Sequence, residues 1–156
     1  MTDFEREIET IMDEICEESA SLIARDATEY FKERFTEKEW DGTPWPPAKS
    51  PKRSGSLLVK SSALLNSIRP TEVTKDRVVI TAGNQKVTYA QVHNEGFSGK
   101  VNVDAFTRNV KGKTQQVRAH TRNTTIPKRQ YMGVTKELED RIMSDIEGLI
   151  ESKFNK

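Results

Sequence analysis

The sequence contains little of the residue chemistry that metal sites and disulfide frameworks require. It has one cysteine, Cys16, and two histidines, His93 and His120, among 156 residues. A single cysteine excludes an internal disulfide framework and is typical of a protein kept in a reducing compartment. A zinc site needs about four convergent ligands, so we expect no metal site and no cofactor. Cys16 falls on the apolar side of a predicted helix, where we expect a small core residue.

Long hydrophobic runs are also missing. No stretch approaches the ~18 apolar residues of a membrane span, and the N-terminus lacks the pattern of a secretory signal. We therefore expect a soluble protein without a membrane partner, made in a cytoplasm. Hydrophobic residues make up 34% of the chain and charged residues 31%. This composition predicts a single domain over residues 1–156, with one modest core and some surface that only a partner orders.

The sequence shows no clear catalytic pattern. Ser61 or Ser62 can be combined with His93 and Asp76 into a triad on paper, but no strand–serine–helix elbow supports that arrangement. The glycines do not cluster into a phosphate-binding loop. We therefore interpret the chain as a non-enzyme, and a hydrolase built around His93 is the least favoured hypothesis.

A net charge of +1 conceals a strong segregation of charge along the chain. Residues 1–40 carry 13 acidic and 5 basic side chains, residues 41–133 carry 5 and 16, and residues 134–156 carry 6 and 4. The pattern indicates a polyanionic partner for the middle segment, or acidic and basic surfaces that meet between copies. The alternative is intramolecular, with acidic helices packed beside a basic sheet.

The N-terminal segment has the clearest helical pattern. Thr2 followed by Glu5 has the form of a capping box, and no breaker occurs before Gly42, which predicts one helix over residues 3–37. Its apolar positions are Phe4, Ile8, Ile11, Ile15, Leu22 and Ile23, widened by Met12 and Cys16 and continued by Tyr30, Phe31 and Phe35. A small core cannot cover such a long helix, so we expect part of it to contact another subunit.

Residues 40–56 contain four of the six prolines and are predicted to form a loop without helix. The only tryptophans, Trp40 and Trp45, lie in this loop. We favour an interpretation in which each ring fixes the loop to the core, with its N–H bonded to the backbone. The alternative is a binding surface for a proline-rich or aromatic partner.

Short elements are predicted for the middle of the chain. They are a helix over residues 63–68 capped by Ser61 or Ser62, a hairpin with strands 72–75 and 77–82, and a helix over residues 88–95 that ends at Gly96. We expect Val73, Val78 and Ile80 on the buried side of the hairpin.

Residues 97–125 alternate apolar and polar side chains but are too polar for a hydrophobic sandwich. With Gly112 at a hairpin tip, they predict a projecting β-arm that is basic at its end and weakly ordered in isolation. The candidate interface residues are Arg108, Lys111, Lys113, Arg118, Arg122 and Arg129. These bases could instead neutralise phosphates in a nonspecific nucleic-acid-binding module.

The C-terminal segment is helical again. Apolar residues from Leu138 to Phe154 fall on one stripe and Thr135 is a suitable cap, which predicts a helix over residues 135–154. The expected fold class is therefore α+β. The long N-terminal helix and the C-terminal helix would pack on a small, mostly antiparallel sheet, with the basic hairpin arm projecting from it.

Four short motifs occur in an order that resembles a known family. They are Trp40-Asp-Gly-Thr-Pro-Trp45, Leu58-Val-Lys-Ser-Ser-Ala-Leu64-Leu-Asn-Ser67-Ile68, Tyr89-Ala90-Gln-Val-His93-Asn94-Glu-Gly96 and Ile126-Pro127-Lys-Arg129-Gln-Tyr131-Met132-Gly133. Their order and spacing resemble the tailed-phage virion morphogenesis family, the tail-completion proteins of contractile-tailed phages and Mu-like prophages. Ser62 departs from the pattern, because relatives commonly carry glycine there.

The resemblance implies a structural protein of the virion neck or tail, assembled in the cytoplasm of a bacterial host. Proteins of this kind complete the tail and join it to the head, and related neck proteins form rings. The implied partners are further copies of the chain, tail-tube, terminator or head-connector proteins, and packaged DNA through nonspecific contact. Tyr89, His93 and Gly96 are expected to shape a short helix, and Arg129 to bridge to a helix carboxylate.

Overall fold

Helix α1 (Asp3–Glu37) begins and ends where its local signals place it. The Thr2 hydroxyl accepts a hydrogen bond from the Glu5 backbone N at 3.2 Å, and the Glu5 carboxylate accepts one from the Thr2 backbone N at 2.6 Å. This is the predicted capping box. The helix ends where Lys38 adopts left-handed dihedrals, φ 62° and ψ 35°. The predicted range of residues 3–37 is confirmed.

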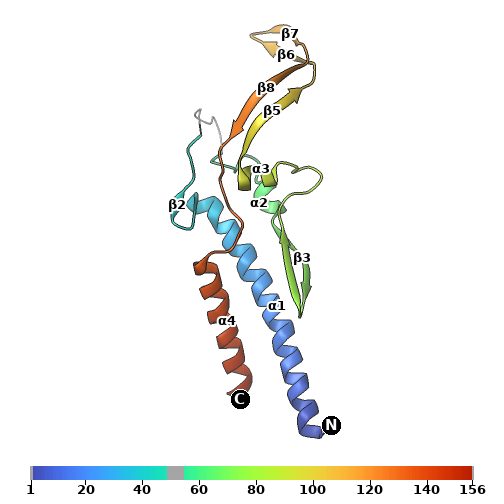
Figure 1. Ribbon diagram of the computed structural model, residues 1–156, viewed down its shortest axis with the longest axis vertical. Helices are drawn as coiled ribbons and strands as arrows, with labels where there is room; N and C mark the ends of the chain where they lie inside the picture. Colours follow the sequence, from blue (N-terminus) through green and yellow to red (C-terminus); the bar gives the residue numbers. More distant parts are fainter. Residues whose placement is uncertain (1, 49–54, 156) are drawn as a thin grey trace.

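The computed structural model describes residues 2–48 and 55–155, which form an elongated molecule with α1 along its length (Figure 1). Helix α4 (Lys136–Phe154) lies antiparallel beside α1. As predicted, Thr135 caps α4, its hydroxyl accepting a hydrogen bond from the Leu138 backbone N at 3.2 Å. Helices make up 44% of the described residues, strands together with isolated β-bridges make up 29%, and the α+β fold class is confirmed.

The strands form two-stranded antiparallel sheets. The pairs within the described residues are β1 (Glu39–Trp40) with β2 (Thr43–Pro44), β3 (Arg69–Thr74) with β4 (Arg77–Thr81), β5 (Phe97–Val103) with β8 (His120–Ile126), and β6 (Phe106–Val110) with β7 (Lys113–Val117). The antiparallel pairing is as predicted. The strands stay in separate ladders because loops and the short helices α2 (Ala63–Ser67) and α3 (Ala90–Glu95) separate successive hairpins.

The buried core surrounds the C-terminal half of α1. Its members are Ala27, Tyr30, Phe31, Phe35, Trp45, Leu64, Ile68, Val87, Ala90, Tyr131 and Leu138. The Phe35 ring packs edge-on against Trp45, with the centroids 5.6 Å apart, and at 5.0 Å from Tyr131. Trp45 Nε1 donates to the Gln130 carbonyl at 2.7 Å, which is the predicted backbone anchor. Of the predicted loop over residues 40–56, residues 49–54 lie outside the described part, and the remainder contains no helix.

Three sequence-based expectations about single residues are wrong. Cys16 is exposed, because neighbouring helix positions lie about 100° apart and Ile15 occupies the buried one. Val73 is 43% exposed, because it borders an open groove between β3 and α1. Ser62 precedes α2 as expected, but its side chain makes no capping bond and its backbone is left-handed, with φ 56°.

Candidate interaction surfaces

The described part of the chain contains neither a cluster of metal-ligating side chains nor a membrane-spanning helix. No group of three or more His, Cys, Asp or Glu residues within residues 2–48 and 55–155 is placed to hold a metal ion. No helix in the same ranges has the length and apolar content to cross a bilayer.

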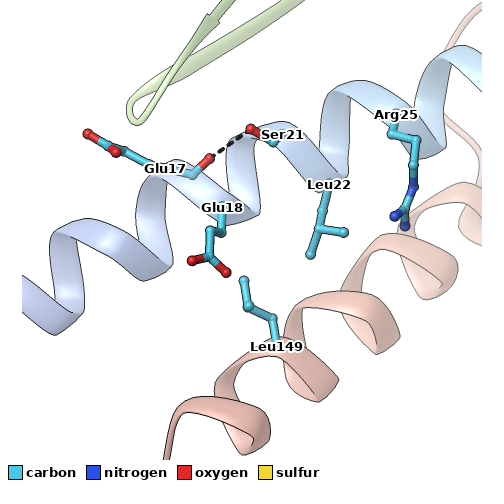
Figure 2. A pocket seen from close by; sticks show the side chains of 6 residues that line it. All are labelled: Glu17, Glu18, Ser21, Leu22, Arg25 and Leu149. Atoms are coloured by element: carbon cyan, nitrogen blue, oxygen red, sulfur yellow. Dashed lines mark hydrogen bonds between the residues drawn. The ribbon is translucent and has the colours of Figure 1, made fainter.

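A groove lies along the line where α1 and α4 pack against each other (Figure 2). The Ser21 hydroxyl in this groove donates to the Glu17 carbonyl one turn earlier, at 3.2 Å. Glu18 accepts a hydrogen bond from Lys153 Nζ at 2.7 Å, which ties α1 to α4. The Lys153–Glu18 contact therefore holds the two helices together, the Ser21 hydroxyl bonds within α1, and neither contact forms a nucleophile–base pair.

Segment 126–133 is bonded to α3 and to the loop that contains Trp45. The Tyr131 hydroxyl donates to the Ala90 carbonyl of α3 at 2.8 Å, and the backbone N of Tyr131 and of Met132 donate to Asn94 Oδ1 at 2.9 and 3.0 Å. Burial raises the pKa of Tyr131 to about 12. The motif that contains Tyr131 thus positions α3, and the bond from Trp45 to the Gln130 carbonyl fixes it to the loop that contains Trp45.

The residues of the neighbouring motif shape α3 as expected. His93 lies on this helix with its ring edge-on to Tyr89, at a centroid distance of 5.6 Å. Gly96 ends the helix with φ 81°, a left-handed value that favours glycine. The ring contact and the turn at Gly96 are thus part of the local structure of α3.

Arg129 is buried, with 7% of its surface exposed. Its Nε donates to the Pro46 carbonyl at 2.9 Å and its Nη2 to the Pro47 carbonyl at 3.1 Å. Burial lowers the pKa of this guanidinium. The expected bridge to a helix carboxylate is therefore wrong, because two loop carbonyls take its place. Arg129 also lies apart from the other candidate interface residues, which are on the arm.

The arm, residues 97–126, projects from the end of the molecule opposite the N-terminus (Figure 1). The β5–β8 ladder forms its base and the β6–β7 ladder its outer part, the distal hairpin. Lys111 and Gly112 both have left-handed backbones, with φ 51° and 79°, at the two-residue turn. The predicted arm and its tip are confirmed.

Five of the six candidate interface residues lie on the arm and are exposed: Arg108, Lys111, Lys113, Arg118 and Arg122. Within the described part of the chain, none of the five makes an ion pair. Arg108 Nε donates to Gln115 Oε1 at 2.9 Å across the distal hairpin. The arm therefore presents positive charge that carboxylates of the described fold do not neutralise.

The two faces of the distal hairpin differ in chemistry. Side chains alternate across a strand, so directly paired residues share a face. One face carries the pairs Phe106–Val117, Arg108–Gln115 and Val110–Lys113, and the other carries Thr107–Gln116 and Asn109–Thr114. Phe106 is 46% exposed and Val110 43%. The first face is thus apolar and basic and the second is polar and uncharged, a difference that sequence reasoning missed although the alternation was visible.

The first turns of α1 form a second surface at the opposite end. Lys75 in the β3–β4 turn pairs with Asp13 at 3.0 Å, and Lys153 near the end of α4 pairs with Glu14 at 3.3 Å. Residues 3–12 extend beyond these contacts and are called the α1 projection (Figure 1). Its apolar side chains Phe4 and Met12 are 70% and 49% exposed. The projection is the part of the helix that the core leaves uncovered.

Comparison with known proteins identifies the family. The sequence matches a family model described as the phage virion morphogenesis family over residues 3–151. No curated protein and no solved structure gives a significant match. The matched range runs from the first residue of α1 into the last turn of α4, and it includes the four motifs that carry the resemblance. The chain therefore belongs to the phage virion morphogenesis family and has a role in building the phage virion.

Proposed function

We propose that this protein completes the phage tail and joins it to the head, acting as an oligomeric component of the neck. The observation that carries the proposal is that two unlike surfaces, the α1 projection and the arm, lie uncovered at opposite ends of an elongated subunit (Figure 1). Heterologous contacts, which build closed rings, need two different complementary surfaces on each subunit. Membership of a virion morphogenesis family supports the same role.

The proposed partners are further copies of the chain and the proteins on either side of the joint. On the tail side these are tail-tube or terminator proteins, and on the head side they are head-connector proteins. The protein acts by binding in this proposal, so its contribution is the shape and charge of its surfaces. It is located at the neck of the finished virion.

A phage carrying a nonsense mutation in this gene tests the proposal. Electron microscopy of the lysate should show heads and tails that accumulate separately, and a plasmid copy of the wild-type gene should restore joined particles. An antibody against the protein should label the neck of the restored virions. Normal numbers of joined, infectious particles from the mutant would contradict the proposed role.

Nonspecific binding of nucleic acid by the arm is the second candidate function. It is favoured by the five exposed cations of the arm, which have no ion-pair partner within residues 2–48 and 55–155. Phosphate contacts of this type weaken steeply as salt rises, since bound counterions are released on binding. Gel-shift titration with duplex DNA at about 50 and 200 mM salt measures this dependence. Tight, salt-sensitive binding together with normal head–tail joining in the nonsense mutant would favour this function over the first.

A further inference from the structure

We propose that the arm of one copy packs on the α1 projection of a second copy, with the apolar and basic face of the distal hairpin against the apolar and acidic side of the helix. The inference rests on the proposed oligomeric function and names the two surfaces that meet. In this arrangement the exposed apolar patch at one end of the molecule is covered by the patch at the other end of a second copy.

The helix side of this contact is an apolar stripe between acidic residues. Phe4, Ile8 and Met12 recur every four residues and therefore lie along one side of α1. Glu7 and Glu9 are each about 100° from Ile8, one on either side of the stripe. Both are exposed, and neither makes an ion pair with another described residue. The projection thus presents an apolar centre with negative edges.

The arm side also combines apolar and charged side chains, and its charge has the opposite sign. Phe106 and Val110 are exposed on one face of the distal hairpin, and Arg108 and Lys113 lie on the same face. Phe106 and Val110 are about 14 Å apart along an extended strand. Phe4 and Met12 are about 12 Å apart along a helix. The two apolar pairs therefore span similar lengths. Glutamates flank the helix stripe, whereas on the arm Arg108 lies between Phe106 and Val110 and Lys113 pairs with Val110, so the two surfaces carry opposite charge.

Geometry and charge together select a second copy as the occupant. The arm and the projection lie at opposite ends of the molecule, so the arm cannot reach the projection of its own chain (Figure 1). Packing of two projections on each other would place Glu7 and Glu9 against further glutamates, and packing of two arms would place Arg108 and Lys113 against further cations. Like charges brought together in an interface are unfavourable. Only the pairing of an arm with a projection brings apolar side chains together and also places opposite charges side by side.

This contact also accounts for an apolar face on an isolated hairpin. A two-stranded hairpin is marginally stable in water without packing on another element. The β6–β7 ladder pairs with no third strand within the described residues. Packing on the helix of a neighbour would cover Phe106 and Val110 and order the hairpin.

Charge exchange in the purified full-length protein tests the inference. Sedimentation velocity at low ionic strength should show self-association of the wild-type chain. The arm variant R108E/K113E and the projection variant E7K/E9K should each associate at least about tenfold more weakly. The quadruple variant that combines all four changes restores opposite charges and should associate again. The control N109E/Q116E adds acidic residues to the other face of the hairpin and should associate like wild type.

Several results would overturn the proposal. They are a wild-type chain that remains monomeric at every concentration, an arm or projection variant that associates like wild type, and a quadruple variant that does not recover. Melting curves of all variants exclude unfolding as the cause of a loss. Sedimentation uses the purified chain alone, so its failure overturns the interface, whereas joined particles from the nonsense mutant overturn the neck function.

Discussion

Tyr131 illustrates how a polar side chain is kept in this core. The residue is 1% exposed, its ring contacts Phe35, and its hydroxyl donates to the Ala90 carbonyl at 2.8 Å. A buried hydroxyl without a partner would be costly, because it loses its bonds to water. The single hydrogen bond to α3 therefore determines whether tyrosine or phenylalanine gives the more stable fold at this position.

We predict that Tyr131→Phe lowers the free energy of unfolding near pH 8 and that the deficit shrinks at high pH. The variant removes the hydrogen bond from the phenol to the Ala90 carbonyl, which costs about 0.5–1.5 kcal/mol. The pKa of Tyr131 rises from 10.0 to about 12 on folding. The unfolded chain therefore loses the phenol proton first, and the wild type loses stability as the pH rises from about 10 towards 12. In the phenylalanine variant, residue 131 does not titrate and makes no such contribution to the pH dependence of the unfolding free energy.

Urea unfolding of both proteins between about pH 8 and pH 11.5 measures this difference. The two chains carry the same lysines and arginines, so subtraction of their unfolding free energies isolates the phenol. A deficit that stays constant over this range would contradict the assigned pKa shift.

The left-handed backbone of Ser62 leads to a second prediction at the residue scale. Its φ of 56° costs an L-residue about 1–2 kcal/mol, and its side chain makes no capping bond that a substitution would remove. Glycine adopts this conformation freely but has a larger entropy in the unfolded chain, worth about 0.5–1 kcal/mol. We expect Ser62→Gly to raise the free energy of unfolding by up to about 1 kcal/mol.

The matched control is Ser62→Ala, which removes the hydroxyl but keeps the strained backbone and should give no gain. Thermal melts of the three proteins make the comparison. A glycine variant that is no more stable than the alanine variant would contradict this prediction, because the strain of the left-handed geometry would then not exceed the entropy cost of glycine.

At the scale of elements, the sequence predicted α1 and α4 well because their signals are local. The capping residues Thr2 and Thr135 and the repeated apolar positions are all visible within a few residues of each helix end. The exposure of Cys16 and Val73 depends on which elements pack beside them, and only the folded structure shows those elements. The division of the strands into separate ladders has the same cause, since no local pattern states which hairpins meet.

The candidate interface was predictable only in part. Charge and alternation located the arm and its tip, and five of the six named bases lie there. Arg129 has the same charge but is buried against Pro46 and Pro47, and its sequence neighbours do not indicate that contact. The excess length of the helix predicted that part of α1 is uncovered. The boundary of the projection at Asp13 and Glu14 depends on the positions of Lys75 and Lys153 in the folded chain.

We predict that residues 99–125 are the most mobile part of a free subunit. The two ladders of the arm have few buried apolar contacts and many solvent-exposed backbone hydrogen bonds, which open easily. Hydrogen exchange should be fast in these residues and slow in the C-terminal half of α1, where Tyr30, Phe31 and Phe35 are buried. Strong protection of the arm in a proven monomer would contradict this prediction.

At the scale of the whole molecule, the segregation of charge along the chain becomes a separation in space. The acidic N-terminal segment supplies the projection at one end, and the basic middle segment supplies the arm at the other (Figure 1). Ion pairs between α1 and α4, such as those of Arg141 with Glu29 and Glu33, use only part of the acidic charge. The remainder is available for contacts between molecules, where charge governs association more than folding.

We predict that oligomers of the protein weaken, but do not vanish, as salt concentration rises. Screening shortens the range of electrostatic attraction to about 3 Å at 1 M salt. Apolar contacts such as those proposed for Phe4 and Phe106 are less sensitive to salt concentration. Sedimentation at about 50 mM and 1 M sodium chloride measures the change. Another salt at the same ionic strength is the control and should act equally. Association that is unaffected by salt would contradict a charged interface.

The last prediction separates the role of the arm in assembly from its role in the fold. Reversal of charge at Arg108, Lys111 and Lys113 together should impair head–tail joining and leave the subunit folded. These side chains are exposed and have no ion-pair partner within the described residues, and single surface changes usually shift stability by less than ~0.5 kcal/mol. Apart from the exposed hydrogen bond of Arg108 to Gln115, their contribution therefore arises when a partner surface or DNA approaches.

Plaque titre from a phage complemented with the triple variant, measured beside a thermal melt of the purified protein, tests this prediction. We expect a large loss of titre with an unchanged melt. Cys16→Ala is the matched control, because Cys16 is exposed on α1 and has no proposed role in assembly, so its titre should equal wild type. A wild-type titre for the triple variant, with an unchanged melt, would mean that the charges at the tip of the arm are incidental to joining.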